Sequence, residues 1–254
     1  MTGVQTCALP IYLVKLLDAA KPDQADIQKS KDILQAAPPA NATNQQLYVF
    51  YRDRARASEQ LGLTKSMLDN CQKEQEYVDP GNRDQFFDAQ MSCIQAEFFD
   101  GNMQGAISRI NKALSSVQAR QSNGWQLTFQ LLLVNANRQI GDLEAAEIAI
   151  REVDSIMTVL KRSNAWSEWG SNWTYQSERA RGEYYLAAGK PVAAELSFVR
   201  GLSAVEKRVE AFEAGLYEDS TRRVHSRQAV YFNKSIILNR LANSLFAQRK
   251  LTDA

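Results

Sequence analysis

Residues 182–202 read GEYYLAAGKPVAAELSFVRGL, and the order of residue types in this stretch decides the fold. One run of helix-forming residues ends at Gly189. A second run opens with Pro191 and carries Ala194 five positions after the glycine. Glycine adopts the positive φ that ends a helix, and proline suits the first turn of the next helix. Because a small residue at position 194 lets the second helix lie close to the first, the stretch predicts a helical hairpin.

The same pattern recurs along the chain. It is found as Gln60-Leu61-Gly62 with Met67, Asp100-Gly101-Asn102 with Ala106, Ile140-Gly141-Asp142 with Ala146, and Arg249-Lys250-Leu251 with Ala254. The turns lie at positions 62, 101, 141, 189 and 249, so the intervals are 39, 40, 48 and 60 residues. Repeated helical hairpins stack into solenoids. We therefore expect an all-α fold, a right-handed α-solenoid of antiparallel helical hairpins with long repeats. A non-repeating helical bundle is the alternative.

The intervals lengthen toward the C-terminus, which predicts longer helices rather than inserted loops. In the last interval, apolar residues continue at helical spacing from Pro191 as far as Phe212. We expect one long helix there.

The composition is that of an ordinary folded chain of 254 residues, with 44% hydrophobic and 23% charged residues. The net charge of +1 gives no global field that would attract nucleic acid or an anionic membrane. Apolar runs such as Leu127–Val134 fall far short of the roughly 20 residues that span a bilayer. We expect no membrane span and no nucleic-acid partner.

Three residue types that often carry chemistry have simpler interpretations here. Cys7, Cys71 and Cys93 have neither metal-ligand spacing nor the pattern of a disulfide framework, and we expect the last two to be small buried side chains. His225 lies among basic residues, which indicates a surface position rather than a catalyst. Three tryptophans at helical spacing either pack in the core, which we favour, or form a ledge for a peptide. They are Trp166, Trp169 and Trp173.

The two ends do not fit the repeat. Residues 1–11 resemble the translation of a common DNA-sequencing adapter, so native sequence is expected to begin near Tyr12. Residues 12–44 are expected to hold N-terminal helices and a proline-containing linker. The array is expected over residues 45–254, cut at Ala254 where a second helix should begin to pack. The compartment stays open because any export signal would be lost, and we favour the cytoplasm.

The pattern resembles the tetratricopeptide-repeat family. The best-matching positions are Gly182, Tyr185, Gly189, Ala194, Phe198 and Leu202, which fall at the family's small, aromatic, turn, small, aromatic and aliphatic positions. The last unit, with Leu241, Ala242, Leu245 and Ala254, matches nearly as well, although Arg249 replaces the turn glycine. The unit of about 40 residues is longer than the 34 of the family. It is similar to the arrays that precede bacterial CHAT domains, which are caspase-like peptidase modules, and to arrays in large signal-responsive ATPase regulators.

This resemblance implies a concave groove lined by the first helix of each hairpin. The corresponding residues here are Arg52, Arg56, Phe98, Asn135, Arg138, Arg179, Asn239, Asn243 and Phe246. Their arginine and asparagine side chains carry donors for a peptide backbone or a carboxylate.

The function that follows is a protein–protein interaction scaffold or a regulatory sensor module of a larger bacterial protein. Its partner would be a protein or peptide, or a neighbouring domain of the same chain. We expect no catalytic residue, cofactor or metal in this part of the chain. Two alternatives stay open: a helical enzyme fragment with an unrecognised site, and a purely structural helical bundle.

Overall fold

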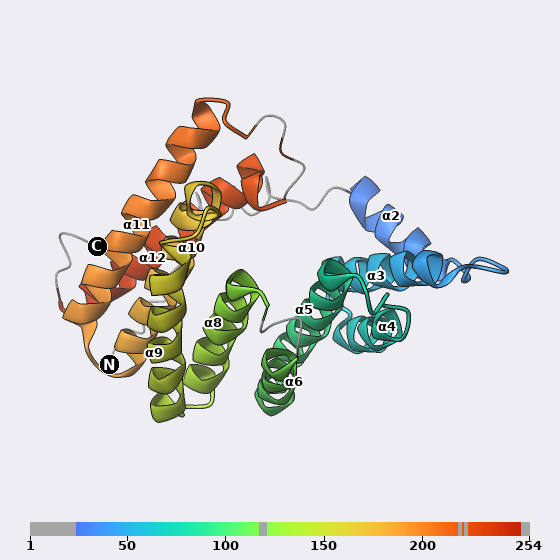
Figure 1. Ribbon diagram of the computed structural model, residues 1–254, viewed down its shortest axis with the longest axis horizontal. Coiled ribbons are helices and arrows are strands. Elements are labelled where there is room, and N and C mark those ends of the chain that lie inside the picture. Colours follow the sequence, from blue (N-terminus) through green and yellow to red (C-terminus); the bar gives the residue numbers. More distant parts are fainter. Residues whose placement is uncertain (1–23, 117–120, 218–219, 221–222, 250–254) are drawn as a thin grey trace, which may run out of the picture. The chain divides into compact units, whose positions relative to one another are not determined.

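The computed structural model describes residues 24–116, 121–217, 220 and 223–249. Within these ranges the chain is all-α and contains no β-strand (Figure 1), which confirms the all-α part of the prediction. The helices are α2 (Gln24–Gln35), α3 (Asn44–Gln60), α4 (Thr64–Glu76), α5 (Arg83–Phe99), α6 (Met103–Ser115), α8 (Asn123–Gln139), α9 (Leu143–Leu160), α10 (Trp166–Ala187), α11 (Pro191–Glu213), the short 3-10 helix η1 (Arg223–His225) and α12 (Arg227–Ala247). The adapter-like residues 1–11 and the start of the last predicted helix, residues 250–254, lie outside the described residues.

The chain divides into two compact units, Met1–Asp100 and Gly101–Ala254. In the first unit α3 and α4 pack as a pair, α5 contacts both of them, and α2 contacts α3. Helix α2 lies in the segment 12–44, where N-terminal helices were expected, and it packs on α3. The boundary near residue 100 was not predicted from the sequence.

A disulfide joins α4 to α5 in the first unit. Cys71 and Cys93 are fully buried, as expected, but their sulfur atoms are bonded at 2.09 Å. The prediction of free cysteines was therefore wrong. The two residues are 22 positions apart in sequence, and only the packing of α4 on α5 brings their Cα atoms to 5.2 Å, which is a normal separation for a disulfide.

The second unit contains two further hairpin pairs, α8 with α9 and α10 with α11. Helix α6 packs on α8, and α12 packs on α11. One core cluster lies between α8, α9 and α10 and contains Leu127, Val153 and Met157; the predicted core position of Trp173 in the same cluster is confirmed. Its ring centroid lies 6.2 Å from those of Trp166 and Trp169, so the three tryptophans pack together.

The repeated turns have one geometry. Gly62, Gly101, Gly141 and Gly189 all have positive φ, between 68° and 81°. At Gly141 the chain closes the helix with two bonds: the Gly141 amide donates to the Arg138 carbonyl at 3.1 Å and the next amide to the Asn137 carbonyl at 2.9 Å. The residue five positions after each glycine is almost completely buried in every case, at 0–2% exposure. Arg249 has φ +61°, so the fifth turn keeps the left-handed conformation without glycine.

The predicted lengthening of the helices is confirmed for α10 and α11, which have 22 and 23 residues against 17 and 13 in α3 and α4. The last interval also contains a connecting segment, because α11 ends before Gly215, whose φ is +75°, and α12 begins only at Arg227. The expectation that helices alone fill this interval was therefore wrong in part.

His225 is buried rather than at the surface. Its side chain is 6% exposed, its ring stacks on Tyr217 with centroids 4.3 Å apart, and Trp169 lies 5.5 Å away. Its Nδ1 atom shares a 2.8 Å hydrogen bond with the Ser220 hydroxyl. This residue therefore holds η1 in place by packing, a role that the basic residues around it in the sequence did not suggest.

Candidate functional site

The expected groove residues of the first unit lie on α3 and α5 above a buried carboxylate. Arg52 is partly buried, with its Nη2 atom 3.2 Å from Asp53 Oδ1 and its guanidinium 5.7 Å from the centre of the Tyr48 ring. Arg56 is exposed on the same helix, and Phe98 is half-buried on α5. The two arginines thus present positive charge on α3.

Glu74 of α4 is the buried carboxylate. It is 0% exposed, and neither of its oxygens has a partner with hydrogen-bond geometry, although the Ser92 hydroxyl is near. Burial raises the pKa of Glu74 to about 7, and the Ser92 hydroxyl and the guanidinium groups of Arg56 and Arg52 oppose this shift without cancelling it. Burial also raises the pKa of Tyr48 to about 12, with Glu74 as the next contribution. The sequence alone gave no signal for this cluster, since a glutamate on a helix is normally exposed.

The expected groove residues on α8 and α10 of the second unit contact other side chains of the chain, and Arg138 among them belongs to an ion-pair network. Glu183 of α10 lies 3.5 Å from Arg138 of α8 and 3.0 Å from Arg240 of α12. Asn135 accepts a 2.8 Å hydrogen bond from Arg138. Arg179 stacks over Tyr175, with its guanidinium 5.6 Å from the ring centre. These arginines therefore have partners within the chain, which the sequence did not reveal.

The remaining expected residues lie on α12. Asn243 donates to Asn239 across one helical turn at 3.4 Å, and Phe246 is 67% exposed. Their positions on one helix agree with the sequence pattern.

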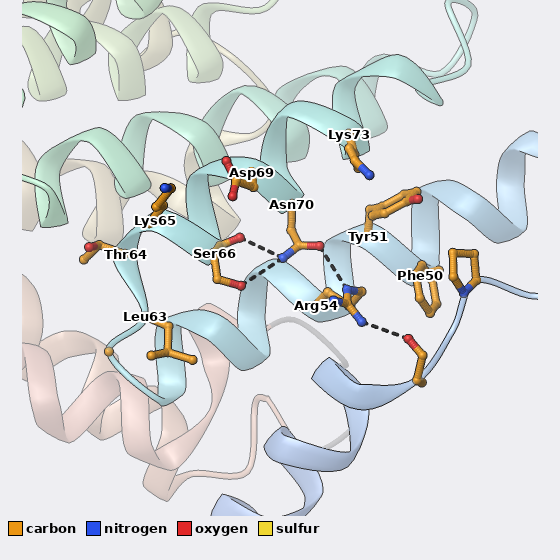
Figure 2. A pocket seen from close by; sticks show the side chains of 13 residues that line it. Phe50, Tyr51, Arg54, Leu63, Thr64, Lys65, Ser66, Asp69, Asn70 and Lys73 are labelled. Atoms are coloured by element: carbon orange, nitrogen blue, oxygen red, sulfur yellow. Dashed lines mark hydrogen bonds between the residues drawn. The ribbon is translucent and has the colours of Figure 1, made fainter.

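A separate open pocket of about 760 Å³ lies in the first unit, between the end of α2, α3 and α4 (Figure 2). Phe50 and Tyr51 of α3 form an aromatic wall, and Lys73 of α4 lies over the Tyr51 ring, 5.3 Å from its centre. Lys65 also lines the pocket, with Asp69 between the two lysines on α4. The lining combines an aromatic wall with charged side chains of both signs.

Arg54 fixes the shape of this pocket. Its Nη1 atom donates to the carbonyl of Leu34 at 2.7 Å. It also donates to the carbonyl of Ala36 at 2.9 Å, and its Nε atom donates to Asn70 at 3.0 Å (Figure 2). The last carbonyls of a helix lack partners within the helix, so Arg54 caps the end of α2. The Arg54 guanidinium therefore stabilises the fold through these hydrogen bonds.

A second open groove of about 450 Å³ lies within the second unit, between α6 and α9 and above α8. Its lining contains Ile107 and Leu114 of α6, Leu133 of α8, and Ile148 of α9. Asp142 and Glu152 are the charged residues of this lining. The lining of this groove is therefore more aliphatic than that of the first pocket, and its charged residues are acidic.

Over the described residues, no group of three or more His, Cys, Asp or Glu side chains is placed to hold a metal ion, and no helix there has both the length and the apolar character needed to cross a bilayer. Comparison with known proteins finds no matching family model, no similar curated protein and no similar solved structure.

Proposed function

We propose that this chain is a tetratricopeptide-like α-solenoid that works as a protein–protein interaction scaffold or regulatory module. The observation that carries the proposal is the repeated turn. Four glycines with positive φ are each followed, five positions later, by a buried residue, and the geometry recurs in both compact units. Repeat proteins of this kind present extended surfaces to other chains.

The surfaces of the described residues fit such a role. Arginines and asparagines lie on the first helices of the hairpins, and open grooves of about 760 and 450 Å³ lie in the first and second units. Both grooves are open at the surface, so side chains of a partner can enter them. The partner would be a protein or peptide, or a further domain of the same protein, as in the arrays that precede bacterial CHAT domains.

An enzyme built among these helices is the competing function. It would need titratable side chains that converge on one open pocket. Glu74 is the carboxyl group with the most strongly raised pKa among those described, and it is fully buried rather than open to a substrate. The observations therefore favour binding.

Selection of peptides from a random 16-residue display library against the immobilised full chain tests the proposal. We expect selected peptides to bind with micromolar Kd in calorimetry. Arg56→Ala removes an exposed side chain from the first unit, and Asn243→Ala removes one from the second. Each variant should lower the affinity for peptides that bind its unit at least tenfold. Arg151→Ala is the matched control, because Arg151 is 64% exposed on α9 and lies 3.4 Å from Glu147 of the same helix. A library that yields no peptide with a Kd below about 1 mM would contradict the scaffold function. Peptides that bind all variants with equal affinity would contradict the concave groove of the first helices as the binding surface.

A further inference from the structure

The groove of the second unit and the pocket of the first occupy the same register of the hairpin. Counted from the turn glycines Gly62 and Gly141, both are lined by the residues eight positions before the glycine and by those four, seven, eight and eleven positions after it. Three of these positions hold Arg54, Asp69 and Lys73 in the first unit and Leu133, Ile148 and Glu152 in the second. The two cavities are therefore equivalent places with different side chains.

This comparison shows that the fold does not require an aliphatic lining. Asp69 and Ile148 stand at the same position of their hairpins, and both are exposed. Ile148 is 49% exposed and Ile140, at the turn, is 41% exposed. A partner that covers Ile148 and Ile140 together would remove adjoining apolar surface from water, which favours binding.

The charge of the groove indicates the sign of that partner. Asp142 and Glu152 line the groove, and among the described residues of its lining there is no lysine, arginine or histidine. Asp142 caps α9 by accepting from the Ala145 amide at 2.9 Å, whereas Glu152 is exposed. Lys73 stands in the first unit at the position that Glu152 holds in the second, so the two cavities favour partners of different charge.

The shape of the groove indicates a helix. Ile107 and Leu114 lie two turns apart along one wall, Ile148 stands on the other, and Leu133 forms the floor. An amphipathic helix places anchors at positions i, i+3 or i+4, and i+7, which reach both walls of a groove between two helices. Carboxamides from Asn111 and Gln130 complete the lining and provide polar contacts.

We propose that the groove between α6 and α9 binds an amphipathic helix of another protein, with aliphatic anchors in the groove and lysine or arginine residues at its margins. This inference rests on the proposed scaffold function and specifies one of its partners. It places binding on a groove lined chiefly by the second helices α6 and α9, whereas the expected inner surface is formed by the first helices.

The test uses the full chain and a fluorescein-labelled 16-residue helical peptide with leucine at i, i+3, i+7 and i+10 and lysine at the flanking positions. Fluorescence anisotropy should give a Kd below about 100 μM for the wild type. Ile148→Asp and Glu152→Lys install residue types that the first unit already carries at these positions, so both variants should fold. Ile148→Asp should weaken binding at least tenfold. Glu152→Lys should weaken binding of the lysine peptide and strengthen binding of a peptide with glutamate in place of lysine.

Leu196→Asp is the matched control, because Leu196 is 57% exposed and stands seven positions after Gly189, the same register in another hairpin. It should leave the Kd unchanged. The proposal is overturned if the peptide does not bind, if Ile148→Asp binds as the wild type does, or if Leu196→Asp loses as much affinity. It is also overturned if sedimentation velocity shows a dimer that Ile148→Asp disrupts, since the occupant is then a second copy. Peptides from the display library that bind only through Arg56 or Asn243 would leave the scaffold function standing while this inference fails.

Discussion

The Nε atom of Arg240 lies 3.0 Å from Oε1 of Glu183, and this ion pair joins α12 to α10. The other oxygen of Glu183 lies 3.5 Å from Arg138 on α8. The Glu183 side chain is only 14% exposed, so its carboxylate is a mostly buried bridge between α8, α10 and α12. A partner's carboxylate would have to compete with Glu183 for Arg138.

We predict that Glu183→Gln lowers the free energy of unfolding by about 1–2 kcal/mol, because two charge-assisted contacts at a mostly buried site are lost. Urea denaturation of the purified chain measures the change. Glu206→Gln is the control, since Glu206 is 48% exposed and pairs with Lys234 at 3.7 Å. It should change stability by less than about 0.5 kcal/mol. Equal effects of the two substitutions would show that the Glu183 network adds nothing to the fold.

Two glycines should respond differently to alanine. Gly141 has φ +81° and open space around an added Cβ, so Gly141→Ala should cost about 1–2 kcal/mol through backbone conformation alone. An added Cβ at Gly182 would lie 2.3 Å from the buried Phe198 ring, so Gly182→Ala should cost more, about 2–4 kcal/mol. Thermal denaturation ranks the two variants. The reverse ranking would contradict the close packing of α10 on α11.

The turn glycines are among the features that could be predicted from the sequence. The turn at Gly141 and the small residue at position 146 are local signals, so hairpins and helix type could be predicted from them. The pairing of Cys71 with Cys93 and of Glu183 with Arg240 could not, because each depends on which helices pack together. The burial of His225 depends likewise on rings that lie elsewhere in the sequence.

We predict that the buried Glu74 makes stability depend on pH. Its pKa is raised by burial from 4.5 to about 7, so the folded protein binds more protons than the unfolded chain between these values. Stability should therefore fall as the pH rises from about 4.5 to 7 and change little above that. Glu74→Gln should be more stable than the wild type at pH 8, by on the order of 3 kcal/mol at most, with the difference vanishing near pH 4.

Urea titrations of both proteins at pH 4, 6 and 8 measure this difference. The groups that face Glu74 are Tyr48, Arg52 and Arg56 from α3 and Ser92 and Asp88 from α5, and burial also raises the pKa of Asp88. Asp88→Asn is therefore the comparison variant. If Glu74→Gln and the wild type have the same free energy of unfolding at every pH, Glu74 is not the group that causes the pH dependence.

The disulfide should contribute about 2–4 kcal/mol to the stability of the oxidised protein. It closes a loop with a sequence separation of 22 residues and is fully buried. Reductant should lower the urea midpoint of the wild type, and a Cys71→Ser, Cys93→Ser double variant should be insensitive to reductant. Thiol titration after denaturation without reductant should find both cysteines oxidised. Disulfides are rare in the cytosol, so this result would favour an oxidising compartment over the expected cytoplasm. Two free thiols at these positions would support the cytoplasm.

Arg54 should decide whether α2 stays attached to the first unit. Its guanidinium donates to the carbonyl of Leu34. It also donates to the carbonyl of Ala36 and to Asn70 of α4 (Figure 2). Arg54→Ala should therefore release residues 24–35, and amide hydrogen exchange there should accelerate at least tenfold while exchange in α8 and α9 stays unchanged. Lysine cannot reach several acceptors in the fixed fork geometry of arginine, so Arg54→Lys should restore only part of the protection. Unchanged exchange in residues 24–35 of Arg54→Ala would show that packing of α2 on α3 is sufficient without the cap.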